Sequence, residues 1–144
     1  MSLSTKILLV ALIAGEVSGC ATGLTSSQKR EYQAYQARGM AVEEKNPGAG
    51  AALGILPGGG SFYVREYGVG VVNLLFWPLS ILWDPISGYD GSLSINYFAT
   101  KAEVNSKMGK ELRDLEDQLF LGTVTKEDYI RRKRDIETKF SAGN

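Results

Sequence analysis

The side chain with the clearest capacity for chemistry is the thiol of Cys20, the one cysteine in the chain. A thiolate is a good nucleophile, so Cys20 can accept a covalent group, but a single cysteine forms no disulfide within the chain. The sequence contains no histidine, which removes the commonest general base and the commonest metal ligand. Carboxylates such as Glu111 and Asp114 lie among lysines and arginines, a pattern typical of a solvated helix face. We therefore predict no enzyme activity, no metal site, no dissociable cofactor and no small-molecule substrate.

The residues before Cys20 have the order of an export leader. Met1–Lys6 carries one positive charge, and the apolar run Ile7–Ala14 that follows is far shorter than the roughly 20 residues that span a bilayer. The segment Val17–Cys20 resembles the lipobox of bacterial lipoproteins, in which an aliphatic residue and two small residues precede a cysteine. The resemblance implies cleavage between Gly19 and Cys20 and a diacylglyceryl group on the Cys20 thiol.

The residue after the cysteine bears on location. In enteric-type lipoproteins an aspartate at this position favours the inner membrane, so Ala21 implies the periplasmic face of the outer membrane, with the inner membrane as the alternative. A single acyl chain binds a membrane marginally, at about 0.8 kcal/mol per buried methylene, whereas two or three chains on one residue hold a protein stably. Membrane lipid is therefore the first partner that the resemblance implies.

Charge and hydropathy divide the chain into segments. Lys and Arg number 16 and Asp and Glu number 16, and this zero net charge argues against a nucleic-acid partner. Apolar residues concentrate in Ile7–Ala14 and Ala51–Trp83, which is typical of a membrane-associated chain with polar extensions. We predict a mainly α fold with four segments: a leader (1–19), a lipidated tether and amphipathic helix (20–47), a glycine-rich apolar hairpin and loop (48–93) and a C-terminal helical pair (94–144).

The amphipathic helix is expected over about residues 26–44. Thr25 and Gln28 have the spacing of a capping box, and Tyr32 and Tyr35 begin a narrow stripe on one face. The stripe is equally compatible with a membrane or partner surface and with packing against the same chain.

Glycines dominate the apolar hairpin. Three of them stand four residues apart and would form one ridge of a helix, which lets another backbone approach closely: Gly50, Gly54 and Gly58. The second apolar stretch, Gly68–Trp83, places Gly70 and Asn73 on one face, so we predict that the ridge packs against these two residues. The residues that follow, Asp84–Ser92, contain the signals of a turn-rich loop.

The segment from Gly50 to Pro85 resembles a two-transmembrane-helix domain with a glycine-rich first helix. Phe62-Tyr63, Gly68, Gly70 and the pair Trp83-Asp84 keep that family's order, whereas Arg65 stands where the family usually has glycine. A straight helix over Gly68–Trp83 would reach about 24 Å, against about 30 Å of hydrocarbon, and Pro78 would kink it. A shallow re-entrant hairpin, or one buried in an oligomer, is therefore as well supported as two full spans.

The C-terminal segment has the pattern of two helices joined at Gly122. Thr125 and Asp128 open the second helix as a capping box would. The turn Gly122-x-Val124-Thr125 resembles the short C-terminal domain (SHOCT), which implies oligomerisation on a membrane protein. A pair this small buries too little apolar surface to be very stable alone, which favours a partner or self-association. We predict that the helices meet through apolar side chains at helical spacing: Leu112, Leu115, Leu119, Tyr129 and Ile136.

Together these patterns predict a non-enzymatic, lipid-anchored protein of the bacterial envelope. Its expected role is an oligomeric scaffold or an accessory subunit of a membrane-associated assembly. The alternative is a monomeric lipoprotein adaptor that recruits a periplasmic partner through its terminal helices.

Overall fold

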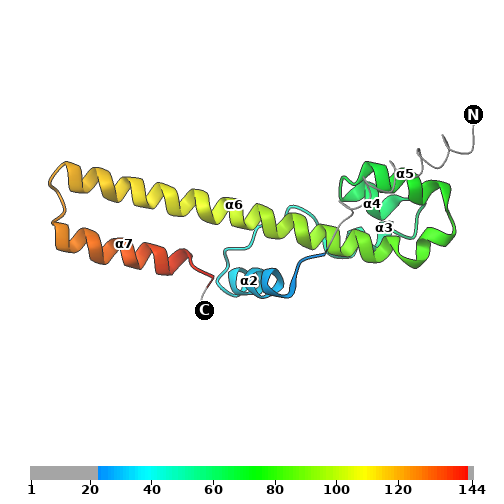
Figure 1. Ribbon diagram of the computed structural model, residues 1–144, viewed down its shortest axis with the longest axis horizontal. Helices are drawn as coiled ribbons and strands as arrows, with labels where there is room; N and C mark the ends of the chain where they lie inside the picture. The colour runs from blue at the N-terminus through cyan, green and yellow to red at the C-terminus, as the bar shows by residue number, and fades with distance from the viewer. Residues whose placement is uncertain (1–22, 143–144) are drawn as a thin grey trace, which may run out of the picture. The chain divides into compact units, whose positions relative to one another are not determined.

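A computed structural model describes residues 23–142, and all regular structure in that range is helical, which confirms the predicted mainly α fold (Figure 1). The predicted cleavage site and lipid site, Gly19 and Cys20, lie outside the described residues. Two compact units are present. Within the described range, unit 1 comprises residues 23–24 and 45–95, and unit 2 comprises residues 25–44 and 96–142. Helix α6 (Asp84–Phe120) begins in unit 1 and continues in unit 2.

Unit 2 begins with α2 (Ser26–Ala37). Its start is the predicted capping box: the Thr25 hydroxyl accepts from the Gln28 N–H at 3.3 Å, and Gln28 Oε1 accepts from the Thr25 N–H at 2.9 Å. The helix ends at Ala37 rather than near Glu44, because Gly39 takes a φ of 67°. This left-handed conformation favours glycine and closes helices.

The other elements of unit 2 are the later part of α6 and α7 (Lys126–Phe140), which run antiparallel (Figure 1). Gly122, with a φ of 69°, ends the first helix, and the Thr125 hydroxyl accepts from the Asp128 N–H at 3.2 Å at the start of the second. The core of unit 2 joins all three helices through Tyr35, Val104 and Phe140.

Unit 1 contains short helical pieces in place of the predicted two-helix hairpin. They are α3 (Pro47–Leu53), α4 (Gly59–Tyr63), α5 (Tyr67–Leu75), the 3-10 helix η2 (Leu79–Leu82) and the first turns of α6. Gly58 breaks the expected glycine-rich helix by taking a left-handed φ of 69°, and Arg65 takes the same φ in the turn between α4 and α5. Among the described helices, none combines the length and the hydropathy that a membrane crossing requires.

The interpretation of Asp84–Ser92 as a turn-rich loop is wrong, because these residues form the first turns of α6. Pro85 lies in the first turn, where its missing N–H has no helical partner to lose. Gly88 and Gly91 are helical positions at which another segment approaches closely. The residues that resembled turn signals therefore act in packing.

Candidate functional site

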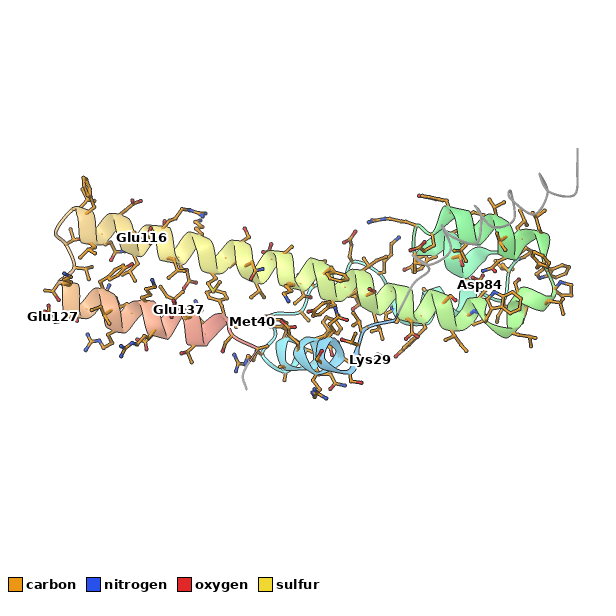
Figure 2. All side chains as sticks on the ribbon, viewed as in Figure 1. Lys29, Met40, Asp84, Glu116, Glu127 and Glu137 are labelled. Atoms are coloured by element: carbon orange, nitrogen blue, oxygen red, sulfur yellow. The ribbon has the colours of Figure 1, made fainter. Side chains whose placement is uncertain are left out.

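Unit 1 inverts the burial pattern of a water-soluble fold. From Val71 to Trp83 only the two polar side chains are buried, Asn73 at 1% and Ser80 at 0% exposure, and every other residue is exposed and apolar. Leu75 and Leu82 are each 75% exposed. In Figure 2 the side chains that project from this part of unit 1 are drawn mostly in carbon orange. Water-soluble domains normally bury such residues and expose polar ones.

The interior of unit 1 consists almost wholly of glycine and small polar residues. Between residues 45 and 95 the one buried hydrophobic side chain is Val64. The apolar side chains of this unit therefore do not form its core. Apart from Val64 and Leu24, which are buried, they are half-buried or exposed.

A buried carboxylate, Asp84, organises the interior (Figure 2). Its Oδ1 accepts from the Ser61 N–H at 3.1 Å, the Ser61 hydroxyl at 2.5 Å and the Asn73 amide at 2.8 Å. Its Oδ2 accepts from the Gly60 N–H at 3.1 Å. The carboxylate thereby ties the start of α6 to α4 and α5, and four donors compensate for its removal from water.

Two further polar side chains complete this interior. Trp83 Nε1 donates to Asn73 Oδ1 at 2.8 Å, so both ends of the Asn73 amide are bonded. The Ser80 hydroxyl is fully buried and has no hydrogen-bond partner among the described residues.

Glycines bring α3 and α4 against α6 at backbone distance. A Cβ on Gly50 would lie 2.3 Å from the carbonyl oxygen of Gly88, and one on Gly54 would lie 2.3 Å from the Pro85 nitrogen. A Cβ on Gly60 would lie 2.6 Å from the carbonyl oxygen of Asp84. The atoms in the way belong to the backbone and cannot rotate aside, so each position requires glycine.

The predicted glycine ridge therefore divides between two partners. Gly58 approaches Gly70, whose carbonyl oxygen would lie 2.3 Å from a Cβ on Gly58. Gly50 and Gly54 instead lie against α6, and not against Gly70 and Asn73 as predicted. Sequence reasoning missed Gly88 and Asp84 as their partners, because both were assigned to the loop. The steps Asp84, Gly88 and Gly91 at helical spacing were the signal that could have identified them.

The charged side chains of unit 1 other than Asp84 are half-buried or exposed, and they lie toward one end of the unit. Lys45 Nζ lies 4.5 Å from the centre of the Tyr63 ring, and Arg65 follows two residues later. Val64 is the neighbour that a Cβ on Gly91 would touch, at 2.9 Å, which places the adjacent Asp90 at the same end. We call Lys45, Arg65, Glu66 and Asp90 the charged end.

Gly23, near the start of the described residues, lies close to the charged end. A Cβ on Gly23 would lie 3.0 Å from Asp90 Oδ2. Gly23 follows Cys20 by three residues in the sequence.

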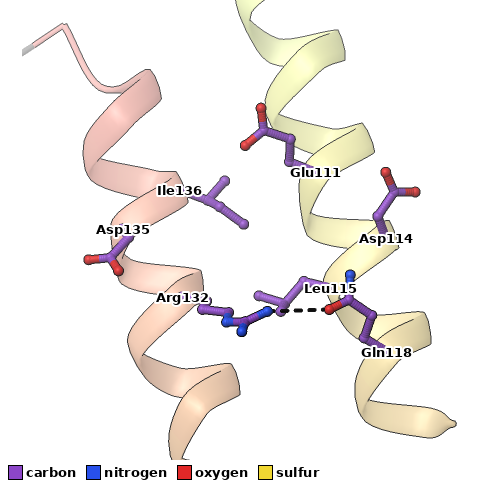
Figure 3. Close-up of a pocket in the computed structure, with 7 residues that line it drawn as sticks. All are labelled: Glu111, Asp114, Leu115, Gln118, Arg132, Asp135 and Ile136. Atoms are coloured by element: carbon purple, nitrogen blue, oxygen red, sulfur yellow. Dashed lines mark hydrogen bonds between the residues drawn. The ribbon is translucent and has the colours of Figure 1, made fainter. Parts of the chain in front are cut away.

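In unit 2 the predicted interface residues lie on α6 and α7, and two of them, Leu115 and Ile136, line a pocket between these helices. Leu115 is buried, and the other four are half-buried: Leu112, Leu119, Tyr129 and Ile136. Figure 3 shows a surface pocket of about 330 Å³ between the two helices, across which Arg132 donates to Gln118 Oε1 at 3.4 Å. Glu111 lines the pocket, and its carboxylate forms a salt bridge with Lys139 Nζ at 2.6 Å, which links α6 to α7. Among the described residues no cluster of three metal-ligating side chains occurs.

A polar network joins α2 to α6 within unit 2. The Tyr97 hydroxyl donates to Glu31 Oε2 at 2.7 Å, and Lys101 Nζ donates to the Tyr97 hydroxyl at 3.2 Å. This hydrogen bond raises the pKa of Lys101, and burial followed by the nearby Glu31 charge raises the pKa of Tyr35. The network stabilises the protonated lysine and the neutral tyrosine.

No protein-family model, curated protein or solved structure matches the chain.

Proposed function

We propose that the chain is a non-enzymatic, lipid-anchored protein of the bacterial envelope that acts as an oligomeric scaffold or accessory subunit of a membrane-associated assembly. The observation that carries the proposal is the inverted burial of unit 1, which has a glycine and polar interior and an apolar exterior. Large exposed apolar surfaces mark contacts with membranes or with other proteins. A lipid on Cys20 would hold this unit at the membrane surface.

Unit 2 supports the assembly part of the proposal. Few side chains are buried between its helices, with Leu115 and Val104 each 3% exposed. The turn between α6 and α7 leaves Phe120 91% and Leu121 71% exposed. An exposed aromatic and aliphatic pair at the tip of a helical hairpin is a suitable anchor for a second copy or a partner subunit.

The native mass of the detergent-extracted wild-type protein tests this function. We expect a mass of several chains that is retained on dilution, and a smaller mass for Phe120→Ser with Leu121→Ser. These two side chains make little contact with their own chain, so the variant retains its helices, which circular dichroism checks. A single-chain mass at every concentration would contradict the scaffold and favour the monomeric adaptor.

A further inference from the structure

We infer that unit 1 inserts into a single leaflet of a phospholipid membrane, with the segment Phe76–Leu82 deepest and the charged end at the headgroups. The inference rests on the proposed membrane location and specifies the ligand and the depth. The occupant of the exposed apolar surface is the acyl-chain region of the lipid.

The dimensions of unit 1 fit one leaflet. Arg65 and Glu66 lie directly before α5, and Phe76 follows its last residue, so α5 separates the charged end from the apolar end. Nine helical residues rise about 13 Å, and half of a hydrocarbon core is about 15 Å. The apolar end therefore reaches close to the bilayer midplane without entering the opposite leaflet.

Charge is distributed along the same axis. Residues 67–83 contain no charged side chain. Asp84, the one ionisable group next to the apolar end, is fully buried and accepts four hydrogen bonds. A unit embedded with its charged end upward would expose no charge to hydrocarbon, where each would be costly.

Backbone hydrogen bonding also suits a medium without water. In the deepest segment three of the six N–H groups, those of Phe76, Leu79 and Ile81, donate to carbonyls at 3.0, 2.8 and 3.3 Å, and Pro78 has no N–H to satisfy. Irregular backbone exposed to hydrocarbon is normally excluded because its polar groups lack partners. Short helices with locally satisfied donors avoid much of that cost.

The spread of the apolar surface favours lipid over a folded partner. Exposed side chains in the later part of α5 are Val71, Val72, Leu74 and Leu75, which cover an arc of about 160° around the helix axis. Exposed side chains continue onto η2 at Leu79 and Leu82. A rigid protein would have to enclose the unit to cover this surface, whereas fluid acyl chains adapt to it.

The position of Gly23 gives a second reason to infer that lipid covers the exposed apolar surface of unit 1. Gly23 lies at Asp90, on the charged end, and Cys20 is three residues earlier in the chain. A lipid on Cys20 would therefore enter the membrane at headgroup level beside unit 1. The anchor and the apolar unit are then compatible with the same leaflet.

Tryptophan fluorescence tests the inference without a label, because the chain has two tryptophans and both lie on the apolar surface, Trp77 at 50% and Trp83 at 41% exposure. Full-length lipidated protein is reconstituted in phosphatidylcholine vesicles whose acyl chains carry bromine at a shallow, an intermediate or a deep position. We expect about a twofold loss of emission with deep bromine, a smaller loss with shallow bromine, and little quenching by aqueous acrylamide. The control Leu75→Glu with Leu82→Glu changes two side chains that are already exposed, and should shift quenching to the shallow position.

The outcomes separate this inference from the proposed function. Vesicle flotation with no bromolipid quenching would overturn insertion while leaving the lipid anchor intact. If quenching is absent and the native mass is that of an oligomer, a second copy covers the surface and the inference is wrong. Deep quenching in a protein of single-chain mass would uphold insertion and contradict the scaffold.

Discussion

Replacing Gly54 by alanine tests whether the helices of unit 1 pack backbone to backbone. The new Cβ would lie 2.3 Å from the Pro85 nitrogen, 2.5 Å from Pro85 Cα and 2.6 Å from the Asp84 carbonyl carbon. Ordinary contacts between such atoms are about 3.5 Å, so α3 and α6 must separate by about 1 Å. The Gly50–Gly88 contact resists that movement.

The cost follows from this displacement. Overpacking of this kind costs about 1–3 kcal/mol, and stretching a hydrogen bond between α4 and Asp84 adds about 1.5–3 kcal/mol. The loss of glycine's freedom in the unfolded chain offsets about 0.5–1 kcal/mol. We therefore expect Gly54→Ala to lower the unfolding free energy of unit 1 by about 3 kcal/mol, a large fraction of a typical domain's stability.

Gly68→Ala is the matched control. Gly68 lies in α5 of the same unit, and a Cβ there would meet nothing within 4 Å. Alanine is the better helix former by about 1 kcal/mol, so this variant should equal or exceed the wild type in stability. Denaturant titration in a fixed detergent, followed by tryptophan emission, reports on unit 1 because both tryptophans lie in it. Equal midpoints for Gly54→Ala and Gly68→Ala would refute close backbone packing.

Two further predictions concern charge. Asp84→Asn replaces one acceptor oxygen by an NH2 group that faces the four donors now bonded to the carboxylate. We expect the denaturant titration to show a loss of about 3 kcal/mol in the free energy of unfolding. An unchanged midpoint would show that the Asp84 hydrogen bonds do not stabilise unit 1. In unit 2 the pKa values of Tyr35 and Lys101 are raised in the folded state. The protonated forms of both side chains therefore contribute to the stability of the fold. This contribution is complete at pH values below the pKa of the unfolded state and is lost as the pH rises through the pKa of the folded state. We expect the free energy of unfolding, monitored by helical ellipticity, to fall above about pH 10, and to fall less in Tyr35→Phe than in the wild type. An equal fall in the wild type and in Tyr35→Phe would contradict a role for Tyr35 in this pH dependence.

Local signals in the sequence predicted much of the fold. The capping box at Thr25 and the N-cap at Thr125 identify the starts of α2 and α7, because the cap and its partner lie within one turn of each other. The apolar spacing in the C-terminal segment includes Leu115 and Ile136, which line the pocket between α6 and α7. The unusual spacing of Gly50, Gly54 and Gly58 correctly indicates close approach of another backbone.

The partners of those glycines could not be predicted in the same way. Gly50 meets Gly88 across a long stretch of chain, and Pro85, Gly88 and Gly91 are individually typical of turns. The turn residues that follow Asp84 suggested a loop, and the donors to its carboxylate come from Gly60, Ser61 and Asn73 on other elements. Tertiary contacts decide these positions.

Arg65 adopts a backbone conformation that residues other than glycine rarely take. Arg65 takes the left-handed φ of 69° that glycine adopts freely. This left-handed conformation costs an arginine about 1 kcal/mol of conformational free energy. It also adds a positive charge at the charged end, where the inferred headgroups would lie.

The most direct test of membrane insertion by unit 1 uses the chain without the proposed leader and the proposed lipid. The residues from Ala21 onward are exported behind a cleavable signal peptide of the non-lipoprotein type, so that neither a leader nor acyl chains remain. We predict that this chain still floats with membranes, because unit 1 enters the leaflet, and that Leu75→Glu with Leu82→Glu releases it into the soluble fraction. Complete solubility of the unlipidated chain with the wild-type apolar surface would contradict the central claim.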